Sequence, residues 1–246
     1  MLGYGRDMTA VLERPAAMRK RPSTFALKQV MAVTGVVFVG FVFIHMIGNL
    51  KVYGGHASLD GYATWLREVG YPLIPKKGVL WALRVTLAVS LVAHVWAAVT
   101  LWLRGRAARG SHRRRSMPRA TAWGARTMLP GGVVILVFVV VHLLDLTIGA
   151  LVSPGSYAHA GPDGVIPAYA NLVASFSRPW MAAFYTFTMV VIGVHIWHGW
   201  RALLQDWGVT GRRFRAAWAA VGAVLALAVV AGNAAIPVLV LAGVIA

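Results

Sequence analysis

Five long apolar segments dominate the chain and limit what it can fold into. A helix needs about 20 mainly apolar residues to cross the hydrocarbon core of a membrane. Each crossing must be helical, because the backbone polar groups have no water to bond within lipid. We therefore predict an all-α integral membrane protein with a bundle of five transmembrane helices, over residues 29–50, 79–103, 128–151, 180–204 and 216–245.

The composition agrees with a protein embedded in lipid. Hydrophobic residues make up 59% of the 246 residues and charged residues only 13%, whereas a soluble domain carries about 25% charged residues. The first 28 residues are polar and basic and lack the apolar run of a signal peptide. We expect a basic cytoplasmic segment over residues 1–28, followed by one five-helix domain over residues 29–246.

Basic residues between the apolar segments predict the orientation. The chain has 24 Lys and Arg against 7 Asp and Glu, a formal net charge of +17, and nothing in it resembles a nucleic-acid-binding module. The basic residues gather in 1–28, in 104–126 and at 212–215, whereas 51–78 and 150–179 carry fewer. Because cytoplasmic loops are rich in Lys and Arg, we expect the N-terminus inside and the C-terminus outside, and no nucleic-acid partner.

The chain contains no cysteine. This excludes disulfides, iron–sulfur clusters held by this chain, and the C-x-x-C-H motif for covalent haem attachment. Any haem must be bound non-covalently, and any iron–sulfur cluster must lie on another chain.

Five histidines lie within the predicted spans: His45, His94, His142, His195 and His198. Ionisable residues at membrane depth are costly and usually functional, although a single histidine could simply form a hydrogen bond to a neighbouring helix. The first four spans each carry at least one histidine and the fifth carries none. This distribution favours a shared function.

The histidines fall into two groups by depth. His45 and His142 lie towards the outer ends of two spans that run in the same direction, whereas His94 and His195 lie about 15 residues into the oppositely directed spans, about 22 Å at 1.5 Å per residue. Two imidazoles at one depth suit a haem iron with both axial positions filled; zinc would prefer a tetrahedral cluster. We predict His45 and His142 as ligands of an outer haem and His94 and His195 as ligands of an inner haem. His198 is an alternative ligand to His195 or a partner for a haem propionate.

Two further charged residues lie in the outer halves of spans. Arg84 lies in the second span and Asp145 in the third. They could form an ion pair with each other, since each needs a partner at that depth. Alternatively, Arg84 could bind a propionate of the outer haem while Asp145 tunes a ligand or handles protons.

Short motifs around the histidines resemble a known family. They are Thr34-Gly35 and His45-Met46, then Val141-His142-Leu143, then His195-x-x-x-Gly199 followed by Arg201 and Trp207-Gly208. In order and depth they resemble the cytochrome b membrane-anchor subunit of succinate dehydrogenase and fumarate reductase, in its five-helix, two-haem form. The resemblance implies haem ligation by the same four histidines, and its H-x-x-x-G motif favours His195 over His198.

The resemblance also implies partners and a function. The chain would relay electrons through two haem b groups between an iron–sulfur subunit and a quinone, expected to be menaquinone. A flavoprotein subunit would interconvert succinate and fumarate, and the complex would lie in a prokaryotic cell membrane. Some fumarate reductases of this family carry a glutamate two residues before the fourth ligand, linked to transmembrane proton movement. Here that position is Gly193, so a proton route through it is not expected.

The quinone could bind at either face. Glu68 matches, by spacing, a carboxylate that family members have near an outer quinone site, whereas an inner site would lie near Ser23, Lys28 and Arg126. We favour the outer site, because two haem positions would span the bilayer. Three rival interpretations stay open: another di-haem anchor, of a hydrogenase or a ferric reductase; a non-redox transporter with buried histidines; and a structural anchor that has lost one haem.

Overall fold

The computed structural model describes residues 21–111, 119–152, 156–162 and 164–246. Five helices in this part of the chain are long and apolar enough to cross a membrane, which confirms the predicted all-α membrane fold. They are α1 (Thr24–Asn49), α3 (Gly78–Arg109), α4 (Arg119–His142), α6 (Pro179–Asp206) and α7 (Arg212–Leu241).

The first helix begins within the predicted basic segment 1–28. The Ser23 hydroxyl accepts a hydrogen bond from the Ala26 N–H at 3.0 Å and caps α1. Such a cap satisfies one of the free N–H groups of a helix start, so α1 starts at Thr24. Residues 1–20 of the predicted segment lie outside the described residues.

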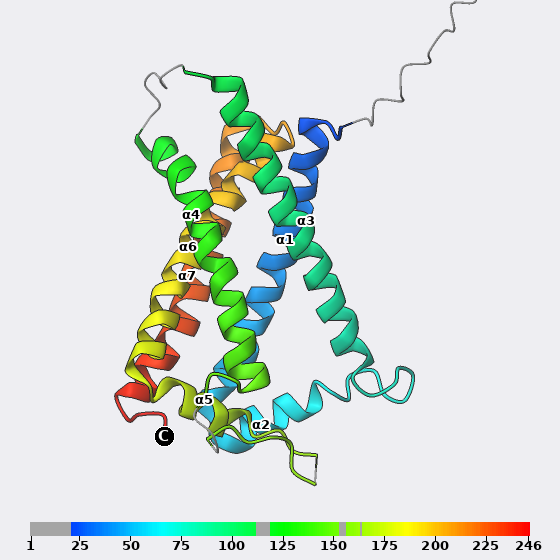
Figure 1. The fold of residues 1–246 in the computed structure, drawn as a ribbon, viewed down its shortest axis with the longest axis vertical. Coiled ribbons are helices and arrows are strands. Elements are labelled where there is room, and N and C mark those ends of the chain that lie inside the picture. Colours follow the sequence, from blue (N-terminus) through cyan, green and yellow to red (C-terminus); the bar gives the residue numbers. More distant parts are fainter. Residues whose placement is uncertain (1–20, 112–118, 153–155, 163) are drawn as a thin grey trace, which may run out of the picture.

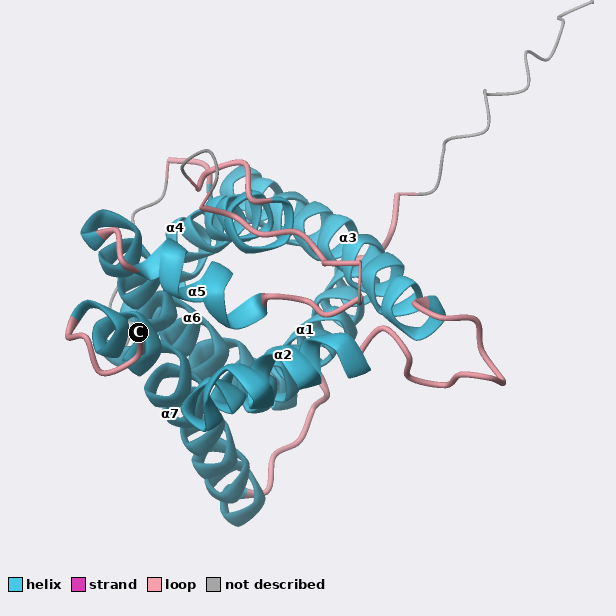
Figure 2. Ribbon diagram, turned by 90° about the horizontal axis from the view of Figure 1, so that it is seen from below, coloured by secondary structure: helices cyan, strands magenta, loops and turns pink. Residues whose placement is uncertain are grey.

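Successive spans run in opposite directions, so α1 begins at one end of the bundle and the chain finishes at the other (Figure 1). We call the end that carries the C-terminus, predicted to face outside, the outer end. Seen along the bundle, α1, α3, α4 and α6 surround its middle, and α7 lies outside this ring against α6 (Figure 2). The four spans that carry histidines are therefore the four that face one another.

Two short helices cover the outer end, where the sequence predicted loops (Figure 1). They are α2 (Gly55–Trp65) and α5 (Ala168–Phe176). The Asp60 carboxylate of α2 accepts a hydrogen bond from the Tyr169 N–H of α5 at 2.8 Å, and the Thr64 hydroxyl accepts one from the Ile166 N–H at 3.2 Å. Side chains of α2 thus hold the start of α5.

Two tight turns shape the outer ends of the spans. A 3₁₀ helix (Leu50–Gly54) joins α1 to α2, and a π-helical turn, η2 (Leu143–Ile148), continues α4. Wider π-helical turns occur often at functional sites. This one carries Asp145, which is fully buried.

Helix α7 is fixed to its neighbours by aromatic and polar contacts. The rings of Trp200 and Trp218 stack at 4.5 Å, and each indole N–H donates to the other residue's carbonyl, at 3.1 and 3.0 Å. On another side, the Asn49 amide of α1 donates to Asn233 of α7 at 2.8 Å. Because its backbone groups bond within the helix, α7 needs only such side-chain contacts to hold it against α6 and α1.

Candidate functional site: facing histidines between the spans

The outer histidines face each other across the middle of the bundle. His45 lies on α1 and His142 is the last residue of α4; their ring centroids are 5.9 Å apart and their planes are inclined at 81°. Phe41 stacks on His45 and Phe138 on His142, with centroids 5.4 and 5.5 Å apart. The outer histidines thus lie at one depth, on two different helices that bring their rings together.

The inner histidines are each backed by a neighbouring helix. His94 of α3 forms a hydrogen bond between its Nδ1 and the Thr34 hydroxyl of α1 at 2.8 Å, and Phe38 of α1 contacts its ring edge-on at 5.8 Å. His195 of α6 lies against α4, where a Cβ added to Gly132 would be 3.7 Å from its Cε1. The inner histidines therefore lie on different helices, each against a neighbouring span.

The contact between Thr34 and His94 also fixes the depth of the inner pair. Thr34 precedes His45 by eleven residues on α1, which corresponds to about 16 Å along the helix axis. The inner and outer histidines therefore lie at separate depths along the bundle.

His198 lies beyond His195, towards the inner end, and packs against α4. Its ring lies 5.2 Å from Trp123 and 4.7 Å from Trp197. A Cβ added to Gly124 would be 2.7 Å from its Nδ1, so glycine at this position is what admits the ring. Its Nε2 is buried and has no hydrogen-bond partner among the described residues. His198 thus packs between α4 and α6 with one ring nitrogen unbonded.

Of the two alternatives left open for Arg84 and Asp145, the ion pair between them does not form in the structure. Asp145 pairs with Arg178, whose Nη2 lies 2.5 Å from the carboxylate, and Arg84 instead lies over the Trp81 ring at 5.1 Å. The reason is the packing of the spans. Helix α3, which carries Arg84, packs mainly on α1, whereas η2 lies beside α5 and α4 beside α6, near the α5–α6 junction that carries Arg178.

Asp145 is also connected to an outer histidine. Its carboxylate accepts hydrogen bonds from the Ser175 hydroxyl and, at 3.2 Å, from the Tyr185 hydroxyl. The Tyr185 oxygen lies 3.4 Å from Nδ1 of His142. Asp145 therefore reaches His142 only through Tyr185.

Sequence reasoning missed the partners in this network. A carboxylate in a span needs a cation, and Arg178 is the one Lys or Arg in residues 150–179, so this signal could have identified it. Ser175 and Tyr185 carried no comparable signal, because hydroxyl groups are common in apolar helices.

The other predicted residues lie at the two ends of the bundle, and Glu68 and Lys28 each form an ion pair with another residue. Glu68 pairs with Lys76 at 2.6 Å on the outer surface, and this hydrogen bond raises the pKa of Lys76. At the inner end, Lys28 pairs with Asp206 at 2.7 Å and Arg126 is exposed. The structure thus does not gather these residues into one site.

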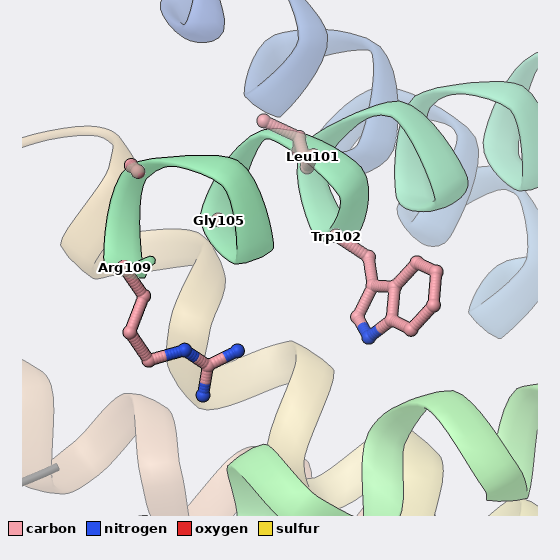
Figure 3. Close-up of a pocket in the computed structure, with 5 residues that line it drawn as sticks. Leu101, Trp102, Gly105 and Arg109 are labelled. Atoms are coloured by element: carbon pink, nitrogen blue, oxygen red, sulfur yellow. The ribbon is translucent and has the colours of Figure 1, made fainter. Parts of the chain in front are cut away.

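A surface pocket lies near the inner end of α3. It is lined by Leu101, Trp102, Gly105, Ala108 and Arg109, and the Trp102 and Arg109 side chains extend from the same side of the helix (Figure 3). None of the candidate histidines lines it, so we assign it no part in the site.

The fold defines a multi-pass membrane protein in which four histidine-bearing spans surround the middle of the bundle. The family model for the succinate dehydrogenase/fumarate reductase transmembrane subunit matches residues 104–234, more than half of the chain. The chain belongs to this family, and with it to the membrane part of that complex. No curated protein and no solved structure matches the chain. The matched region includes His142, His195 and His198 but not His45 or His94.

Proposed function

We propose that the chain is the membrane anchor and two-haem cytochrome b subunit of a succinate:quinone oxidoreductase. His45 and His142 would hold an outer haem, and His94 and His195 an inner one. The observation that carries this proposal is that His45 and His142, on different helices, face each other with their ring centroids 5.9 Å apart.

The surroundings of the rings support two haems. His45 is exposed and the other three histidines are only partly buried by the described chain, although all four lie within spans. Uncovered imidazoles are costly in lipid, and a flat apolar group between the helices would cover them. Two neutral imidazoles are also a suitable ligand set for one haem iron.

Bound haem would supply one-electron transfer. The chain's own part would be to hold the two haems at separate depths, with His45 and His142 as ligands of one and His94 and His195 as ligands of the other. Electrons would pass between an iron–sulfur subunit at the inner face and a quinone, which we take to be menaquinone. The reaction of succinate would belong to a flavoprotein subunit, and the complex would lie in a prokaryotic cell membrane.

Haem quantification in the purified complex tests this proposal. We expect two haems b per chain, together with copurified flavoprotein and iron–sulfur subunits. His45→Ala and His142→Ala should each lose the outer haem alone, and His94→Ala and His195→Ala the inner haem alone. His198→Ala distinguishes the two candidates for the inner ligand and should keep both haems if His195 is that ligand. A reduced spectrum of the wild type without haem bands would contradict the proposal and favour a non-redox transporter.

We also propose that the quinone reacts at the outer end. Two histidine pairs at separate depths would serve no purpose for a quinone at the inner face, and the inner candidate Lys28 already pairs with Asp206. Electrons crossing to the outer end work with or against the membrane potential, at about 2.3 kcal/mol per charge per 100 mV. Succinate-to-menaquinone activity in intact cells should therefore change when an uncoupler is added; unchanged activity would rule the outer site out.

A further inference from the structure

One histidine of each proposed ligand pair is hydrogen-bonded at Nδ1 to a hydroxyl group of a neighbouring helix. In the inner pair, the Thr34 hydroxyl of α1 lies 2.8 Å from Nδ1 of His94. In the outer pair, the Tyr185 hydroxyl of α6 lies 3.4 Å from Nδ1 of His142. The direction of each hydrogen bond decides which ring nitrogen carries the proton.

Thr34 can only accept a hydrogen bond from His94. A hydroxyl has a single hydrogen, and Thr34 donates its hydrogen to the Val30 carbonyl oxygen at 2.6 Å, one turn earlier in α1. His94 must therefore donate through an Nδ1–H group. In a neutral imidazole this leaves Nε2 with a free lone pair.

Tyr185 is committed in the same way. Its hydroxyl donates to the Asp145 carboxylate at 3.2 Å. An ionised carboxylate only accepts hydrogen bonds, and Asp145 forms an ion pair with the Arg178 guanidinium. The phenol oxygen therefore accepts the Nδ1–H of His142, which again leaves Nε2 unprotonated.

We propose that Thr34 and Tyr185 are positioning residues that fix the tautomer and the ring orientation of His94 and His142, so that each would offer an unprotonated Nε2 to the iron of its proposed haem. This inference rests on the proposed di-haem function. A group that accepts the second N–H of a ligating histidine raises the basicity of the ligand. A more basic ligand stabilises ferric iron, so each hydroxyl should lower the midpoint potential of its own haem.

The experiment compares Thr34→Val and Tyr185→Phe in the purified full complex. Midpoint potentials come from optical redox titration and the ligand environment of each ferric haem from EPR. We expect Thr34→Val to raise the potential and alter the EPR signal of the inner haem alone, and Tyr185→Phe to do so for the outer haem alone. Each variant is thereby the control for the other.

Two further variants separate positioning from packing. Thr188→Val also removes a buried α6 hydroxyl, which bonds only the Phe184 carbonyl, at 2.8 Å, and should change neither haem. Thr34→Ser keeps the hydroxyl and should restore the wild-type inner signal, which decides the question even if Tyr185→Phe fails to assemble. Two haems with unaltered potentials and EPR signals in Thr34→Val or Tyr185→Phe would overturn the inference. A wild-type complex without haem would instead refute the proposed function.

Discussion

At the scale of single residues, the most demanding feature is the buried carboxylate of Asp145. It is fully buried in a span, which would be prohibitive for an isolated charge. Arg178, Ser175 and Tyr185 supply its hydrogen bonds, and the Arg178 side chain is itself only 18% exposed. The charge is therefore stable only while all of these partners are present.

Removing the cation alone should be the most damaging change in this network. Arg178→Met leaves Asp145 charged and unpaired, and we expect a loss of about 3–5 kcal/mol of stability. The measurement is the thermal unfolding of the purified complex in detergent. The double variant Asp145→Asn with Arg178→Met removes both charges and should lose less than Arg178→Met alone. A double variant that is less stable than the single one would contradict this account.

At the scale of elements, the short helices α2 and α5 form a cover over the outer end of the bundle. Helix α5 starts at Ala168 without a side-chain cap of its own. Asp60 of α2 provides the cap instead, through the N–H of Tyr169. The start of α5 is therefore capped by a segment that is far away in the sequence.

Loss of this cap should loosen α5 specifically. Asp60→Ala removes the acceptor and should cost about 1 kcal/mol, seen as faster hydrogen–deuterium exchange in residues 168–171. Glu68→Gln is the matched control, because this carboxylate pairs with Lys76 and should leave the exchange of α5 unchanged. Equal exchange in Asp60→Ala and the wild type would show that α5 is held by other contacts.

Helix α6 packs closely on α7 at Gly193. A Cβ added there would run into the Val230 side chain and lie 3.5 Å from the Ala226 carbonyl oxygen. The position that carries a glutamate in some fumarate reductases therefore has no room for a longer side chain here. At this position the structure has a close contact between α6 and α7 instead of a glutamate side chain.

Even a methyl group at position 193 should lower the stability of the protein. Gly193→Ala forces α6 and α7 apart and should destabilise the protein by about 1–3 kcal/mol, measured by thermal unfolding. Gly40→Ala in α1 is the control, since no atom lies within 4 Å of a Cβ added there. If both variants unfold at the same temperature, the contact with Val230 is not tight.

At the scale of the whole molecule, the four histidine-bearing helices alternate in direction and surround the centre of the bundle. Spans α1 and α4 run one way and α3 and α6 the other (Figure 1). The outer histidines come from the first two and the inner ones from the second two. The orientation in the membrane decides which of these pairs would face an iron–sulfur partner.

Reporter fusions test that orientation. Alkaline phosphatase, which is active only outside the cytoplasm, should be active when fused after Ala246 and inactive when inserted in residues 112–118. Fluorescent protein fusions should give the reverse result. The physical reason is the excess of Lys and Arg in 1–28, 104–126 and 212–215. An active phosphatase in residues 112–118 would invert the topology and exchange the inner and outer pairs.

Much of this arrangement could be predicted from the sequence, because lipid fixes the conformation of every span. Once a segment must be helical, the residue number gives the position along the helix axis at 1.5 Å per residue. The relative depths of His45, His94, His142 and His195 in the membrane follow from this. The lack of cysteine likewise needs no structure to exclude protein-bound iron–sulfur clusters. Spans, depths and excluded chemistry were therefore determined by the sequence alone.

Only the tertiary structure decided which side chains of neighbouring helices contact each other. Asp145 could have paired with Arg84, but helix packing gives it Arg178; Thr34 and Tyr185 could have faced lipid, but they back the histidines. Height along a helix depends on the helix itself, whereas the neighbour at a given height depends on how residues distant in the chain pack together. Neither the hydropathy of the sequence nor the spacing of its residues indicates how the helices pack together.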